Sequence, residues 1–85
     1  MIIEASNVIP GDMISVKPGS CAYQDIGGPE AIGWLNSDMI VVVLAVMRCQ
    51  EEYRIAIFIA YDHPLKIGWI DSQTRDSIFI HNVRR

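Results

Sequence analysis

The chain has 85 residues and a mass of 9.5 kDa, which leaves room for one domain and one hydrophobic core. Apolar residues make up 51% of it and charged residues 20%, a composition that excludes a disordered tail or linker. The net charge of −3 argues against a protein held to nucleic acid by electrostatics, since such proteins carry a basic excess.

The N-terminal residues carry no basic stretch followed by a long apolar run, so we expect no signal peptide. The longest uncharged apolar run is residues 39–47, far short of the roughly 20 residues that a membrane-spanning helix needs. We therefore expect a cytoplasmic protein with no membrane partner. Cys21 and Cys49 are expected to be reduced thiols, because two cysteines do not make a disulfide framework, although their number allows a bridge.

Turn-forming residues divide the first part of the chain. Pro-Gly pairs at 10–11 and 18–19 each predict a type II turn. Residues 13–17 between them predict a short, half-exposed strand. Residues 18–31 hold three glycines and two prolines and predict a long loop, which favours a functional role for it.

The remainder alternates between β-branched segments and polar turns. Residues 39–47 show this most clearly, because stiff β-branched side chains suit a strand better than a helix. The strands predicted here are residues 32–35, 39–47, 53–61, 66–70 and 77–83. A tight hairpin turn is expected at 62–65, and a single 3₁₀ turn capped by Asp71 or Ser72 is expected within 71–76.

No segment shows a sustained helical period, so the sequence predicts an all-β domain of five or six strands, a small barrel or sandwich. We expect residues 10–83 to form the barrel and residues 84–85 to trail from it. Residues 1–9 are expected to pack on the barrel or on a partner, with their apolar side chains covering part of the outer face of strand 39–47.

The segments at 32–37 and 67–72 share the pattern Ile-Gly-Trp-aliphatic-Asn/Asp-Ser. One interpretation is a shared local need, in which the glycine lets another backbone or ring approach closely. The alternative is a pair of related half-barrels.

The order of segments from residue 53 onward resembles the end of an SH3-like barrel: a strand, a short hairpin, a strand, a single polar turn and a closing strand. Residues 11–16 with the loop after them resemble the first strand and long first loop of that fold. The resemblance implies a barrel that closes through its last strand.

The motifs of the peptide-binding SH3 family are missing. The first loop lacks its tyrosine-rich motif, Glu52-Tyr53-Arg54 stands in place of its tryptophan pair, and residues 71–74 replace its proline-containing motif. Binding of proline-rich peptides is therefore not implied.

Residues 11–19 also resemble the opening strand of the plasmid-type dihydrofolate reductases, which are SH3-like tetramers. The functional lysine of that family falls on Val16, and the strand that lines its shared pore has only residues 77–80 as a counterpart. That activity is not implied either.

Few residues are arranged for chemistry. His63 and His81 form no ligand motif with the cysteines, so we predict no metal site, and we predict no cofactor and no catalytic residue. Gly27-Gly28-Pro29 cannot lead into a helix as a phosphate-binding loop does.

A ligand-binding rim is predicted around the long loop, because loops on a rigid scaffold tend to carry function. Its residues are Tyr23, Asp25, Trp34 and Trp69. The aromatic members could form a Tudor-like cage for a methylated cation, although core or rim packing accounts for them as well. A nucleic-acid-binding barrel of the KOW or Tudor type is the alternative function; only Arg54 beside Tyr53 hints at it, and two neighbouring glutamates offset that charge.

Strand 39–47 has no polar or charged side chain on either face. A strand of a small barrel ordinarily buries one face in the core and exposes the other to water. Because both faces of this strand are apolar, its outer face must be buried against another segment or another chain. We therefore predict a non-catalytic binding or assembly module that self-associates, most simply as a dimer, through Val42, Leu44 and Val46. A third class is a small oligomeric enzyme with a shared inter-subunit site, and a short chain of this kind also suits a phage or mobile element.

Overall fold

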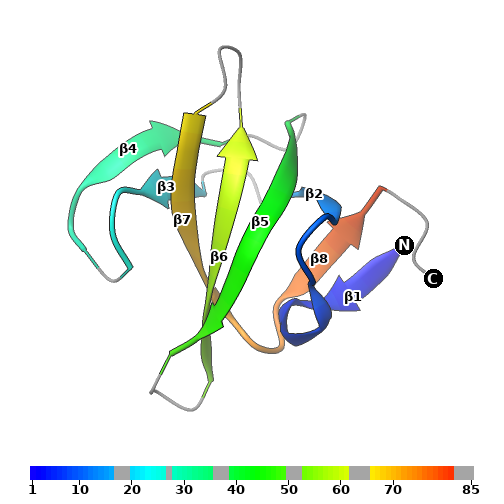
Figure 1. Ribbon diagram of the computed structural model, residues 1–85. Coiled ribbons are helices and arrows are strands. Elements are labelled where there is room, and N and C mark those ends of the chain that lie inside the picture. Colours follow the sequence, from blue (N-terminus) through cyan, green and yellow to red (C-terminus); the bar gives the residue numbers. More distant parts are fainter. Residues whose placement is uncertain (17–19, 27, 36–38, 50–52, 62–65, 82–85) are drawn as a thin grey trace.

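The computed structural model describes residues 1–16, 20–26, 28–35, 39–49, 53–61 and 66–81. It confirms the all-β prediction: these residues form one antiparallel sheet (Figure 1). Its strands are β1 (Ile2–Glu4), β2 (Met13–Ser15), β3 (Cys21–Tyr23), β4 (Ala31–Trp34), β5 (Ile40–Arg48), β6 (Arg54–Tyr61), β7 (Lys66–Gln73) and β8 (Ser77–Ile80). A short 3₁₀ helix, η1 (Ala5–Asn7), follows β1. None of the helical residues in the described part forms a segment long and apolar enough to cross a membrane.

The sheet has eight strands, not the predicted five or six, and their order is β1-β8-β2-β5-β6-β7-β3-β4. The sheet curls strongly, with β4 at one side of Figure 1 and β1 at the other. Within the described residues β1 and β4 do not pair, so the ladder is open and the predicted closure is not found. The curl still encloses one core, because buried side chains of β2, β5, β6 and β8 belong to a single hydrophobic cluster.

That core is almost entirely aliphatic. Along β6, Ile55, Ile57 and Ile59 are fully buried, as the alternation within residues 53–61 predicts. The cluster is completed by the following buried residues: Ala5, Val8, Ile14, Val16, Ala22, Leu35, Val41, Val43, Tyr61, Ile70, Ile78 and Ile80.

The first Pro-Gly turn forms as predicted. Asp12 N–H donates to the Ile9 carbonyl at 3.2 Å, and Gly11 has a φ of 94°. That φ belongs to the left-handed region required after proline in a type II turn. The buried Asp12 carboxylate accepts the Ile9 N–H at 3.0 Å and closes the turn from the other side. The second Pro-Gly pair lies outside the described residues.

The segment 18–31, predicted as a loop throughout, contains a strand. β3 pairs with β4 and β7, and the Gln24 N–H donates to the Glu30 carbonyl just beyond the hairpin. The three residues of β3 stand between glycines and prolines and are too few to show the alternation that predicts a strand. Hydrogen bonds to β7, which lies far along the chain, supply the stabilisation that local sequence does not.

The single turn predicted before the last strand is present, with the Asp76 N–H donating to the Gln73 carbonyl at 3.0 Å, but Asp71 and Ser72 do not begin it. β7 instead runs to Gln73, and a two-residue turn at Thr74 and Arg75 follows. The Asp76 carboxylate holds this turn, accepting the Ser72 hydroxyl at 3.0 Å and the Gln73 N–H at 2.9 Å. The capping carboxylate therefore follows the turn, whereas Asp71 or Ser72 was expected to begin it.

The N-terminal segment does not cover the outer face of β5. β1 pairs with β8 at the edge of the sheet, and η1 buries Ala5 in the core. Ile2 and Ile9 remain exposed. The segment lengthens the sheet, and β5 keeps its outer face uncovered within the described residues.

Candidate functional site

The outer surface of β5 is apolar. In the first half of the strand Val41 and Val43 are buried, whereas Ile40, Val42 and Leu44 are exposed. The alternation has the period of two that a strand imposes. The outward positions of the strand are as apolar as its inward ones. The strand therefore exposes a hydrophobic surface to solvent where a polar surface is usual.

The strand register extends this surface sideways. Met13 on β2 lies opposite Val42, and Ile2 on β1 lies opposite Phe79 on β8. Side chains opposite one another on one face are close neighbours and form continuous rows across a sheet. We call six of the exposed apolar residues of these four strands the apolar face: Ile2, Met13, Ile40, Val42, Leu44 and Phe79; Met47, which is also exposed near the end of β5, is not included.

Two polar side chains within the apolar face are bonded to each other. Ser15 lies opposite both Ile40 and Phe79, and its Oγ forms a hydrogen bond with Nε2 of His81. The Phe79 ring meets the His81 ring edge-on, with centroids 4.8 Å apart. Because the hydroxyl and the imidazole nitrogen already have partners, an apolar surface can cover them at reduced cost. Sequence reasoning missed this pair, whose members lie 66 residues apart.

A β-bulge at Leu44 changes which residues belong to the apolar face. Val43 pairs with Ile59, but the next pair is Ala45 with Phe58. The extra residue reverses the alternation, so Val46 turns inward and packs against the core. Val46 therefore does not belong to the apolar face, whereas Val42 and Leu44, which are predicted with it as interface residues, are exposed.

The predicted ligand rim is brought together in part. Tyr23 lies opposite Trp69, and the Trp69 ring also meets Phe58 with centroids 4.7 Å apart. Trp34 lies on the edge strand β4 and is 74% exposed, and Asp25 lies in the exposed turn after β3. The structure thus makes a neighbouring pair of Tyr23 and Trp69.

A hollow that sequence reasoning missed lies where β6 begins and β7 ends. It has a volume of about 280 Å³ and is lined by Tyr53, Gln73, Thr74 and Arg75. Its backbone is tied together: the Thr74 N–H donates to the Tyr53 carbonyl at 2.9 Å, and the Ser6 N–H donates to the Thr74 carbonyl at 3.0 Å. The one feature of the sequence that could have indicated this hollow is the polar run 71–76, which by itself predicts only a turn.

Other chemistry is sparse in the part of the chain that the structure describes. There, no three His, Cys, Asp or Glu side chains converge in a way that could hold a metal ion. Cys21 and Cys49 are both free thiols and half-buried. The chain matches no protein family, no curated protein and no solved structure.

Proposed function

We propose that the chain is a non-catalytic, self-associating module whose simplest assembly is a dimer joined through the apolar face. The observation that carries the proposal is the exposure of the apolar face along four hydrogen-bonded strands. Leaving a Val, Leu or Ile side chain in water forgoes roughly 1.5–3 kcal/mol relative to burial. A contiguous surface of this kind marks an interface in soluble proteins.

The chemistry of the face favours a second copy of the chain as the occupant. None of the six residues that define it carries a charge, so a charged partner surface would lose hydration and gain no counter-charge. An identical face is apolar over the same area. A two-fold axis lets one such surface cover the other, because an isologous contact is self-complementary.

An SH3-like barrel remains the architecture that we propose for the module. Support comes from five consecutive strands of the sheet, β8-β2-β5-β6-β7, which follow the order that such a barrel has: closing strand, first strand, and the three-stranded meander. The β3–β4 hairpin then occupies the place of the long first loop.

Sedimentation equilibrium at micromolar concentration tests the proposal. We expect the wild-type chain to sediment at twice its 9.5 kDa mass, and Val42→Asp to reduce this to a single chain. Ile26→Asp is the matched control, since Ile26 and Val42 are each 37% exposed but Ile26 lies in the turn after β3. It should leave the dimer intact.

Val42→Asp could lose the dimer simply because the chain unfolds. Val42→Thr is a second variant that avoids this ambiguity, because threonine keeps the β-branched shape of valine. It should weaken the dimer without loss of the strand signal in circular dichroism. A folded wild-type chain that sediments at 9.5 kDa would refute the proposal. An Ile26→Asp variant as monomeric as Val42→Asp would place the interface elsewhere.

A further inference from the structure

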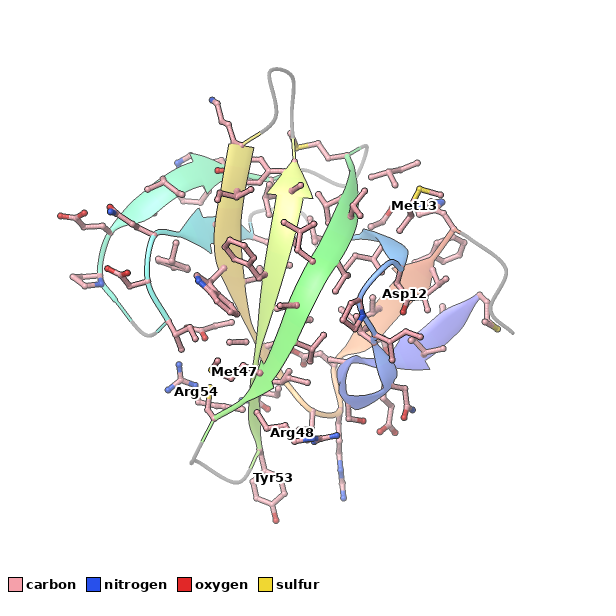
Figure 2. All side chains as sticks on the ribbon, viewed as in Figure 1. Asp12, Met13, Met47, Arg48, Tyr53 and Arg54 are labelled. Atoms are coloured by element: carbon pink, nitrogen blue, oxygen red, sulfur yellow. The ribbon has the colours of Figure 1, made fainter. Side chains whose placement is uncertain are left out.

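Aromatic and basic side chains gather at the end of the sheet where β5 finishes and β6 begins. Figure 2 shows Arg48, Tyr53 and Arg54 together there, with Tyr53 pointing away from the sheet. Arg54 is paired with Asp71 at 3.1 Å. Arg48 donates to the Ser6 carbonyl at 3.4 Å, so its guanidinium keeps a positive charge that this carbonyl does not neutralise.

Arg75 contributes a second such charge. Among the described residues neither Arg48 nor Arg75 forms an ion pair with a carboxylate. Two guanidinium groups that have no carboxylate partner among the described residues favour an anionic ligand at this end of the sheet, although the charges of Glu51 and Glu52 in the sequence oppose them. A guanidinium also matches the geometry of phosphate oxygens, to which it can donate two parallel hydrogen bonds.

The Tyr53 side chain is 60% exposed and lines the hollow together with Arg75. An exposed ring beside positive charge is the arrangement on which nucleobases stack. Gln73 and Thr74 line the same hollow, and an amide and a hydroxyl side chain can each donate to and accept from the edge of a base.

The hollow is small and its backbone is ordered before any ligand arrives. Its volume of about 280 Å³ is just below the range of ligand pockets, roughly 300–1,000 Å³, so the hollow is limited to a small ligand. The hydrogen bonds of Thr74 with Tyr53 and Ser6 tie the turn after β7 to the residue before β6 and to η1. Binding therefore does not have to order these segments first.

We propose that this hollow binds a nucleoside monophosphate, with the base on the Tyr53 ring and the phosphate on Arg75, assisted by Arg48. The nucleotide can be free or an unpaired unit of a single strand, since the chemistry is shared. Among the described carboxylates nearby, Asp71 pairs with Arg54, and Asp76 accepts two hydrogen bonds within its own turn; Glu51 and Glu52 precede Tyr53 in the sequence and lie outside the described residues. The site does not depend on self-association, because its lining residues are not in the apolar face.

The test is an NMR titration of the full chain with AMP, adenosine and inorganic phosphate in parallel. We expect AMP to bind at least about tenfold more tightly than either fragment, since stacking and phosphate contacts add. Tyr53→Leu and Arg75→Gln should each weaken AMP binding about tenfold. Both side chains are exposed, so neither variant is expected to unfold the chain.

Two matched variants serve as controls. Trp34→Leu removes an exposed aromatic from β4, and Lys66→Gln removes a cation from the opposite end of β7; both should bind AMP as the wild type does. No binding of AMP at about 5 mM would overturn the proposal, as would loss of binding in Trp34→Leu with Tyr53→Leu unaffected. AMP binding no tighter than phosphate binding would also overturn it.

A five-nucleotide oligoadenylate distinguishes the two sources of the ligand. Tighter binding of the oligomer than of AMP would support an unpaired nucleotide of a single strand. Equal or weaker binding would support a free nucleotide. In both cases the same Tyr53→Leu loss must appear, and an oligomer that binds the variant as well as the wild type would count against the site.

Discussion

The backbone of Gly33 on β4 packs so closely against the Tyr61 ring on β6 that a Cβ on Gly33 would lie 2.6 Å from the Tyr61 hydroxyl oxygen. β4 and β6 are not neighbours in the strand order, so this contact crosses the interior of the curled sheet. The buried Tyr61 ring therefore links the β3–β4 hairpin to the centre of the sheet.

We predict that Gly33→Ala destabilises the protein by about 1–3 kcal/mol, because the added methyl group forces the ring or the strand to move. Urea unfolding followed by tryptophan fluorescence measures the loss. Combining it with Tyr61→Phe should recover part of the loss, since the nearest clashing atom is then gone. Strict additivity of the two changes would show that Gly33 and Tyr61 do not interact as described.

The bulge at Leu44 predicts opposite effects for two valines of β5. Val46→Asp places a carboxylate against the core and should lower the free energy of unfolding by about 2–4 kcal/mol. Val42→Asp lies on the apolar face and should alter the sedimenting mass more than the stability of the chain. Equal destabilisation of the isolated chain by both changes would mean that the two valines share a face.

Gly11→Ala should destabilise by about 1–2 kcal/mol through the backbone alone. The Gly11 φ of 94° is unfavourable for an L-residue, while among the described residues, its two chain neighbours aside, no atom lies within 4 Å of the position that its Cβ would take. Gly11→Asn should cost less, since asparagine tolerates left-handed conformations better. Thermal unfolding of the two variants, recorded side by side, gives the comparison; a fully stable Gly11→Ala variant would contradict the turn geometry.

Asp12→Ala should lower the free energy of unfolding by about 1–3 kcal/mol. The Ile9 N–H loses its acceptor in this variant, at a site where the native Asp12 is only 2% exposed. Asp12→Asn keeps a carbonyl oxygen at that position and should retain part of the stability. Amide hydrogen exchange at Ile9 reports directly on the bond: we expect faster exchange in Asp12→Ala than in Asp12→Asn. Unchanged exchange in both would exclude the side-chain bond as the source of protection.

Much of the sheet could be predicted without coordinates. The alternation in 53–61 places Ile55, Ile57 and Ile59 on one buried face, as observed. One of the two interpretations of the shared Ile-Gly-Trp pattern is a need for close approach, and a Cβ at Gly68 would lie 2.9 Å from that of Ala22, just as a Cβ at Gly33 would crowd Tyr61. These features depend on contiguous residues and on the period of a strand.

The candidate site was harder to predict. Val42 and Leu44 are exposed as expected, because an all-apolar strand must present some apolar side chains outward. Val46 was misplaced because sequence alternation carries no mark of a bulge. The hollow beside Tyr53 needs Gln73, Thr74 and Arg75 to meet a residue some twenty positions earlier, which no local pattern encodes.

By itself, the sequence determined the all-β class, the turn at Pro10-Gly11 and the apolar character of both sides of β5, since backbone preferences and side-chain polarity are properties of each short segment. Only the tertiary structure decided that β3 is a strand, that Leu44 is a bulge and that the sheet stays open between β1 and β4 in the described residues. The reason is that strand pairing depends on hydrogen bonds offered by a distant partner, and on the side chains that the partner places opposite.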